Sequence, residues 1–139
     1  MTSTKALLSV TAWLETITGV ALLASPSVPA SLLLGASLDP LGSAVARVAG
    51  AAVLSLGVAC WLARRDGESR PGRAVASAML VYNLAVVVVL AHASLVLGAT
   101  GVLLWPAVGL HTALAAWCGI YLLWKWHTEV RQQAEPAGG

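Results

Sequence analysis

The stretch at residues 74–98, AVASAMLVYNLAVVVVLAHASLVLG, decides the fold of this chain. It contains no Asp, Glu, Lys or Arg, and it is longer than the roughly 20 apolar residues that a helix needs to cross the hydrocarbon core of a bilayer. Its apolar residues form continuous runs, whereas the strands of a membrane β-barrel alternate apolar and polar positions. The stretch therefore predicts a membrane-spanning helix.

Three further stretches predict helices of the same kind, at residues 6–24, 41–63 and 102–126. Four spans of about 20 residues use ~80 positions, which leaves little chain for a domain outside the membrane. Only the segment Ala99-Thr100-Gly101 separates the last two spans, so these helices are expected to form a tight antiparallel hairpin. We predict a single integral membrane domain over residues 1–139. Its fold class is all-α, a membrane-embedded antiparallel four-helix bundle, with a flexible polar tail at 132–139.

The composition excludes the common soluble classes of protein. The chain has 139 residues, of which 58% are hydrophobic and 10% are charged, and its mean hydropathy is +0.82. Soluble domains are about 45–50% apolar and about 25% charged. A disordered chain needs the opposite bias, and the two cysteines, Cys60 and Cys118, are too few for a disulfide scaffold. Without a Cys-x-x-Cys motif, both thiols are interpreted as buried apolar fillers.

Between the first two predicted spans lies a short apolar segment at residues 30–35, bracketed by prolines and Asp39. One interpretation is a half-turn that lies in the membrane interface and caps the outer mouth of the bundle. The other is an apolar loop that rests on lipid.

Lys and Arg gather on one side of a four-span arrangement. They are Lys5, Arg64, Arg65, Arg70, Arg73, Lys125 and Arg131. The loops on the other side, at 25–40 and 99–101, contain neither residue type. The positive-inside rule therefore predicts that both termini are cytoplasmic. Because the basic residues follow this topology and form no stripe with interleaved aromatic residues, no nucleic-acid partner is predicted.

Ionisable side chains inside the spans are the candidates for function, because burying them in a bilayer is unfavourable and they normally face protein or a cavity. Glu15, Arg47, His92 and His111 lie on small-residue helix faces, at similar estimated depths in the outer half of the bundle. We expect them to converge in one polar layer. Asn83 lies about 180° around its helix from His92, so it is expected to face another neighbour or a second subunit.

The polar layer supports two interpretations of equal weight, a binding or catalytic site and a purely structural network. In the first, the bundle binds a small lipophilic molecule, and a buried Glu and His transfer protons as an isomerisation requires. The predicted catalytic residues are Glu15, His92 and His111, and the predicted ligand-binding residues are Arg47, Trp13, Trp117 and Tyr121. The last two belong to an aromatic stripe of a kind that more often serves lipid contact or helix packing.

Glu15 and Arg47 carry opposite charges on the first two predicted spans, and their depths differ by only about 4.5 Å. We predict that they interact, directly or through one water molecule. Such a pair would keep Glu15 ionised, because arginine stays charged.

Other functions remain open from the residues alone. Haem held between His92 and His111 is disfavoured because helices of a hairpin pack about 8–10 Å apart, and a metal site would lack a recognisable ligand spacing. The cofactor is therefore unknown.

The main alternative to ligand binding is a non-catalytic accessory subunit of a larger membrane complex. A transporter would require a homo-oligomer, since four spans are few.

Two segments carry a resemblance to a known family. One is GVALLASP at residues 19–26, followed by LLLG at 32–35, and the other is RVAGAAVLSLG at 47–57. Together they resemble the small four-span bacterial membrane proteins grouped as DoxX-like. The resemblance covers about the first half of the chain and implies a four-helix architecture and a bacterial inner membrane. Members of the group are commonly uncharacterised or accessory to redox systems. The resemblance implies no catalytic residue, and neither His92 nor His111 belongs to it.

Overall fold

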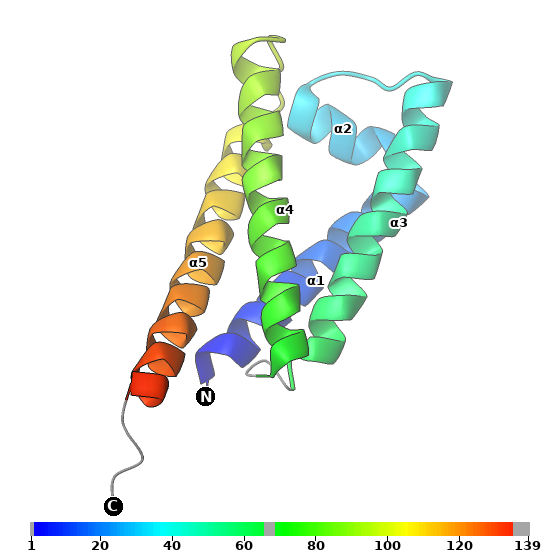
Figure 1. Ribbon diagram of the computed structural model, residues 1–139. Helices are drawn as coiled ribbons and strands as arrows, with labels where there is room; N and C mark the ends of the chain where they lie inside the picture. The colour runs from blue at the N-terminus through cyan, green and yellow to red at the C-terminus, as the bar shows by residue number, and fades with distance from the viewer. Residues whose placement is uncertain (1, 66–68, 135–139) are drawn as a thin grey trace, which may run out of the picture.

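The computed structural model describes residues 2–65 and 69–134, and these fold into five helices (Figure 1). The helices are α1 (Thr2–Ala24), α2 (Ser27–Leu34), α3 (Pro40–Ala63), α4 (Arg70–Leu95) and α5 (Leu104–Ala134). All except α2 are long and apolar enough to cross a membrane. The protein is therefore a multi-pass, all-α membrane bundle, as the sequence predicted. The predicted tail begins inside α5, and residues 135–139 lie outside the described part.

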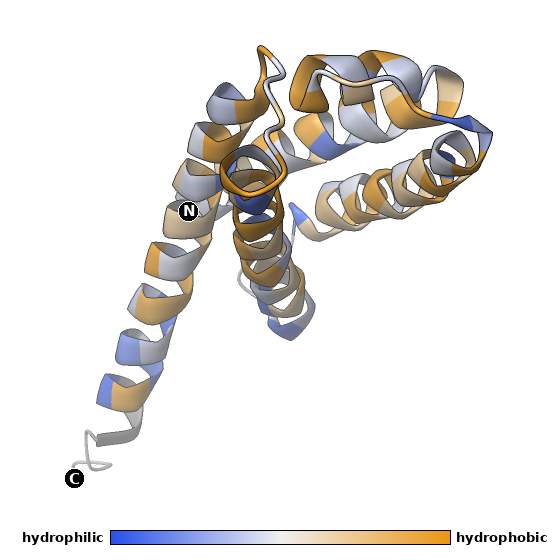
Figure 2. Ribbon diagram, turned by 90° about the horizontal axis from the view of Figure 1, so that it is seen from above, coloured by the Kyte–Doolittle hydropathy of each residue, from blue (hydrophilic) through white to orange (hydrophobic). Residues whose placement is uncertain are grey.

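The four long helices form two antiparallel pairs, α1 with α3 and α4 with α5. Figure 1 shows that α3 diverges from α4 toward the end at which α2 lies. We call that end the outer end and the opposite end, where α1 begins, the inner end. Seen from above, apolar residues cover the outward faces of the long helices, and hydrophilic residues gather near the ends of α4 and α5 (Figure 2). Such surfaces suit a lipid environment.

Glycines allow α1 and α3 to approach closely. A Cβ atom added to Gly19 of α1 would lie 2.6 Å from the backbone nitrogen of Leu54. A Cβ added to Gly50 of α3 would lie 2.7 Å from the Leu22 Cβ. Neither position has room for a side chain. Small residues at the contact are the usual means by which membrane helices pack, since lipid provides no hydrophobic force between them.

Helices α3 and α4 begin in the same way. The Asp39 carboxylate accepts a hydrogen bond of 2.6 Å from the Gly42 amide, and the Ser69 hydroxyl accepts one of 3.3 Å from the Gly72 amide. A proline lies in the first turn of each helix, Pro40 in α3 and Pro71 in α4, where its missing N–H is not needed. These caps satisfy amides that have no partner within the helix, and they fix where each span starts.

The short helix α2 covers the outer end of the bundle, in agreement with the first interpretation of segment 30–35. It ends at Gly35, whose φ of 72° is the left-handed conformation that favours glycine. The Leu103 amide donates a hydrogen bond of 2.8 Å to the Leu32 carbonyl. A Cβ added to Gly101 would lie 2.2 Å from the Leu33 carbonyl carbon. Helix α2 is therefore attached through its backbone to the connection between α4 and α5.

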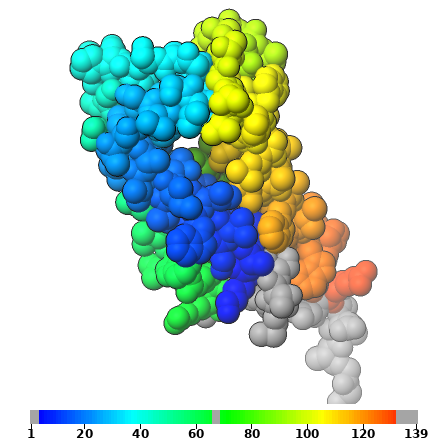
Figure 3. Space-filling model, turned by 180° about the vertical axis from the view of Figure 1, so that it is seen from behind, coloured from blue at the N-terminus to red at the C-terminus, as the bar shows by residue number. Residues whose placement is uncertain are grey.

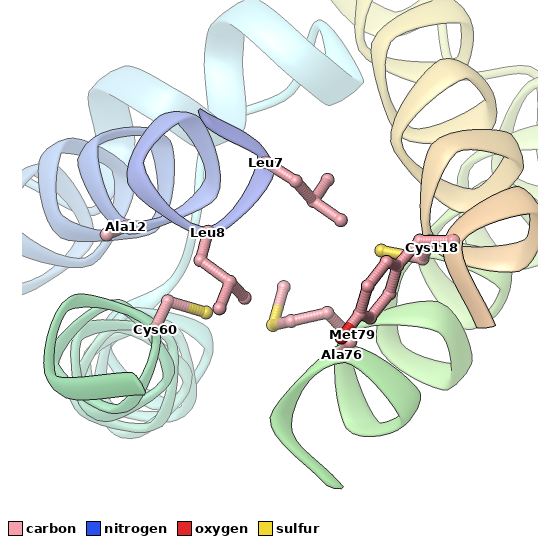
Figure 4. Close-up of a cluster of buried hydrophobic side chains, with 8 residues drawn as sticks. Leu7, Leu8, Ala12, Cys60, Ala76, Met79 and Cys118 are labelled. Carbon is pink, nitrogen blue, oxygen red and sulfur yellow. The ribbon is translucent and has the colours of Figure 1, made fainter. Parts of the chain in front are cut away.

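The apolar core lies toward the inner end and draws on all four long helices (Figure 4). Its buried members are Leu7, Leu8, Ala12, Cys60, Ala76, Met79, Cys118 and Tyr121. Both cysteines are free thiols inside this cluster, where they act as small apolar residues. The core holds the two helix pairs together below the level at which α3 and α4 diverge.

Candidate functional site

Glu15 is buried in the middle of α1, with 2% of its surface exposed. It lies four residues below Gly19, on the side of α1 that faces α4 and α5. The Tyr82 hydroxyl of α4 is within hydrogen-bonding reach of the Glu15 carboxyl group. A buried carboxyl group requires such a partner, because leaving it without one in an apolar environment is unfavourable.

His111 of α5 is held by Asn83 of α4. The two side chains meet at 2.7 Å, between His111 Nδ1 and Asn83 Oδ1. The Asn83 side chain is fully buried, and its Nδ2 donates a hydrogen bond of 2.7 Å to the Met79 carbonyl. That bond fixes the orientation of the amide, so Oδ1 must face the imidazole as an acceptor. His111 Nδ1 therefore carries a hydrogen, and in the neutral ring Nε2 is left with a lone pair.

Glu15, Tyr82 and His111 line one small cavity, which we call the Glu15 cavity. Its walls are Leu14, Glu15, Thr18, Tyr82, Leu110, His111 and Leu114, and its volume is about 50 Å³. The space is enough for one or two water molecules or for one polar head group. In the space-filling view from behind, a hollow separates α1 from α5, with α4 behind it (Figure 3). The cavity lies between these same helices.

The rings of Tyr82 and His111 fix the shape of the cavity. Their centroids are 5.9 Å apart and their planes meet at 77°, which is an edge-to-face contact. Edge-to-face packing is a favoured geometry for aromatic rings. Three groups that can donate or accept protons therefore surround one enclosed space, a carboxyl from α1, a phenol from α4 and an imidazole from α5. Groups of these types are the usual general acids and bases of enzymes.

The structure brings together a different set of residues from the predicted layer. Glu15 and His111 meet, but His92 is exposed near the outer end of α4, where it lines a separate surface pocket of about 680 Å³ with α2. Asn83, which was expected to face elsewhere, is the partner of His111. His92 therefore lies outside the Glu15 cavity, whereas Asn83, which the sequence analysis set apart from the polar layer, adjoins it through His111.

The register of α4 against α5 explains this error. The sequence prediction turned the chain at residues 99–101, which places His92 level with His111. In the structure α4 ends at Leu95, and the connection runs back alongside the last turn of α2, to which it is hydrogen-bonded, before α5 begins at Leu104. Figure 1 shows α5 starting below the outer end of α4. His111 therefore lies at the level of Asn83.

The predicted pair between Glu15 and Arg47 is wrong. The Arg47 guanidinium donates a hydrogen bond of 2.7 Å to the Leu23 carbonyl. Leu23 lies in the last turn of α1, where carbonyl groups have no partner within the helix and a positive charge is favourable. It is eight residues from Glu15, about 12 Å along the helix, which is beyond the reach of one water molecule. Arg47 therefore caps α1, and the argument that it keeps Glu15 ionised no longer applies.

The predicted aromatic ligand contacts lie away from the Glu15 cavity. Trp13 is exposed on α1 and packs edge-to-face against Trp61, with ring centroids 5.8 Å apart. Tyr121 is buried in the apolar core, and Trp117 packs against that core. Trp117 and Tyr121 thus serve helix packing, which was one of the interpretations of the stripe beside lipid contact and ligand binding.

The metal site and the two-histidine haem site that were considered from the sequence are not formed in the described part of the chain. Residues 2–65 and 69–134 contain no group of three or more His, Cys, Asp or Glu side chains placed to hold a metal ion. His92 and His111 do not face one another, so they do not form the two-histidine site that was weighed for haem.

Tyr82 is the member of the site that sequence reasoning missed. The signal was present, because Tyr82 is the only aromatic residue within the apolar stretch 74–98 and directly precedes the buried Asn83. A hydroxyl in the middle of a span requires a partner. Adjacent residues of a helix differ by about 100° in direction, so Tyr82 reaches Glu15 of α1 while Asn83 reaches His111 of α5.

Comparisons with known proteins do not assign the chain to a family. No family model matches the chain, and neither a curated protein nor a solved structure gives a significant match. The resemblance to DoxX-like proteins therefore stays a prediction.

Proposed function

We propose that this membrane protein binds a small lipophilic molecule whose polar head enters the Glu15 cavity. One observation carries the proposal: Glu15, Tyr82 and His111, from three helices, line a cavity of about 50 Å³ within the apolar bundle. A scaffold needs no such cluster, because interhelical polar contacts in membranes contribute only about 0.6 kcal/mol on average. The unfavourable free energy of burying an ionisable group in a membrane is several times larger than this gain.

The entrance to the cavity favours a ligand that arrives from the bilayer. Thr18 of α1 and Leu110 of α5 are exposed at its rim, and these two helices have few contacts with each other. The apolar part of a ligand would lie between α1 and α5, against Leu14 and Leu110. A head of one or two oxygen atoms, such as a carbonyl or hydroxyl group, suits the size of the cavity and the hydrogen-bonding groups around it.

The arrangement also supports proton transfer on the bound head group. His111 Nε2 accepts a proton in the tautomer that Asn83 selects. The Glu15 carboxyl and the Tyr82 hydroxyl line the same space, and the hydroxyl, or the carboxyl in its protonated form, donates to an oxygen atom of the head group. A base and an acid in contact with one substrate are what a proton-shifting isomerisation needs.

The cellular setting belongs to the same proposal. We place the protein in the inner membrane of a bacterium with both termini cytoplasmic, supported by the one-sided Lys and Arg distribution and by the DoxX-like resemblance. One argument for the alternative, an accessory subunit of a larger complex, no longer holds. Asn83 was expected to face a partner, and its amide is satisfied within the chain.

The experiment is to purify the protein in a mild detergent, extract it with organic solvent and identify bound lipophilic molecules by mass spectrometry. The wild-type protein should carry one class of molecule in roughly equal amount to the protein. Glu15→Gln and His111→Ala should lose most of it, because each removes a group from the cavity.

His92→Ala is the matched control, since it removes an imidazole from the same bundle at a site outside the cavity. It should retain the molecule at the wild-type level. Equal retention in the His111→Ala and His92→Ala proteins, or a purified wild-type protein without any enriched molecule, would overturn the proposal.

A further inference from the structure

A second, independent site lies on the outside of the α1–α3 pair, toward the inner end. Ala12, Trp13 and Thr16 of α1 and Val58 and Trp61 of α3 line a groove of about 250 Å³. We call it the α1–α3 groove. Apart from the Thr16 hydroxyl its walls are apolar side chains, and it opens away from the core, on a surface that faces lipid in a membrane.

Two tryptophans form the inner boundary of the groove. The rings of Trp13 and Trp61 meet edge-to-face at 81°, and 58% and 43% of their surfaces are exposed. Trp61 lies near the end of α3 (Pro40–Ala63), and tryptophan at a helix end is typical of the level of the lipid headgroups. Trp13 lies in the middle of α1 (Thr2–Ala24), so the groove runs from the inner end of α3 toward the middle of α1.

Positive charge is concentrated where the groove ends. The Arg64 guanidinium lies over the Trp61 ring, with its central carbon 3.1 Å from the ring centroid. Lys5 is on the same face of α1 as Ala12 and Thr16, at spacings of seven and eleven residues. Because α1 and α3 are antiparallel, the start of α1 and the end of α3 lie at one end of the pair.

The charge of Arg64 is not neutralised within the described residues. In the ranges 2–65 and 69–134 one ion pair is present, between Arg73 and Glu129 at the inner ends of α4 and α5. Arg65 follows Arg64 directly and is exposed. Arg64 thus lies at the Trp61 end of an apolar groove, and Arg65 and Lys5 add positive charge at the same end of the α1–α3 pair.

We propose that the α1–α3 groove binds one anionic phospholipid. One acyl chain lies in the groove between Trp13 and Trp61, and the phosphate is held by Arg64, with Lys5 and Arg65 contributing charge. Arginine binds phosphate through paired N–H donors, and the stacking of Arg64 on Trp61 holds its guanidinium at the mouth of the groove. A zwitterionic lipid fits the apolar walls equally well but gains less from three basic residues.

Native mass spectrometry of the delipidated protein tests this directly. The probes are phosphatidylglycerol and phosphatidylcholine with identical acyl chains, added separately at matched concentrations. We expect one phosphatidylglycerol molecule to bind at least fivefold more tightly than phosphatidylcholine. Arg64→Gln should reduce phosphatidylglycerol affinity about fivefold, the ratio that corresponds to about 1 kcal/mol per basic residue near a membrane surface.

Val58→Trp tests the acyl-chain site, because a large side chain at this half-exposed position fills the groove. It should abolish the selective binding of phosphatidylglycerol. Val48→Trp is the matched control, since Val48 is 72% exposed on the same helix and does not line the groove. Arg70→Gln is the control for the loss of one positive charge elsewhere in the protein.

The two variants test the proposal separately, so a poorly folded Val58→Trp protein still leaves the result for Arg64→Gln. Equal affinity for the two lipids overturns the proposal, as does an Arg64→Gln protein that binds phosphatidylglycerol like the Arg70→Gln protein. Neither outcome bears on the Glu15 cavity, which lies on the other side of α1.

Discussion

The two helix pairs are held together by different means. The α1–α3 pair packs through glycines, at Gly19 and Gly50, and its backbones touch. The α4–α5 pair has glycines at 109 and 119 around which an added Cβ would meet nothing within 4 Å, and it is joined by the hydrogen bond between Asn83 and His111. The α1–α3 pair is thus held by close backbone packing, whereas the α4–α5 pair is joined by a side-chain hydrogen bond beside the Glu15 cavity.

The largest expected effect is at the α1–α3 contact. In Gly19→Leu the new side chain would collide with the backbone of α3, so the helices must separate. We expect a loss of about 3 kcal/mol or more in the free energy of unfolding, the upper part of the range for overpacked positions. SDS titration of the protein in mixed micelles measures this quantity. Gly109→Leu is the matched control and should change it little, and equal losses in the two variants would show that α1 and α3 do not touch.

The next effect concerns the bond between α4 and α5. Asn83→Leu leaves the N–H of the half-buried His111 without its acceptor, which should lower the free energy of unfolding by about 1–2 kcal/mol. Adding His111→Leu should restore part of that loss, because the unsatisfied donor is then removed. The same SDS titration, applied to both single variants and the double variant, gives the coupling energy. Strictly additive losses would mean that the two side chains are not bonded.

A smaller effect is expected at Tyr82. Tyr82→Phe keeps the ring against His111 and removes only the hydroxyl that faces Glu15. Loss of one hydrogen bond should lower the free energy of unfolding by about 1 kcal/mol. Under the proposed function, retention of a lipophilic molecule, measured by mass spectrometry, should fall much more than stability does. If both properties stay at the wild-type level, Tyr82 takes no part in the site.

The smallest expected effect is an absence of coupling between Glu15 and Arg47. Each belongs to its own environment, so Glu15→Leu and Arg47→Leu should change the free energy of unfolding additively, within about 0.5 kcal/mol. A double-mutant cycle of SDS titrations measures the coupling. A clearly larger coupling would restore the ion pair that the sequence suggested.

The fold was predictable because hydropathy and length are local properties of the sequence. Each predicted span lies mostly within one long helix, and segment 30–35 falls in the short helix α2 and the Gly35 that ends it. The caps at Asp39 and Ser69 follow from residue type alone. None of these features depends on how one helix is placed against another.

The site was only half predictable, because it depends on register between helices. Glu15 and His111 were found, since a charged or imidazole side chain in the middle of a span demands an explanation. His92 and Asn83 were exchanged because hydropathy does not reveal where the α4–α5 connection turns. Arg47 was misplaced because its true acceptor, the Leu23 carbonyl, is a backbone group that every sequence contains.

The division of the Glu15 cavity between the two helix pairs has a consequence for biogenesis. Glu15 leaves the ribosome and enters the membrane with α1, whereas Tyr82 and His111 follow only with α4 and α5. The glycine-packed α1–α3 pair can assemble as soon as α3 is inserted. Until α4 and α5 arrive, the Glu15 carboxyl group faces lipid. The carboxyl group then gains its partners in one step when the second pair docks. Arrested nascent chains should show Glu15 accessible to a carboxyl-reactive lipophilic reagent after insertion of α3 and protected after insertion of α5.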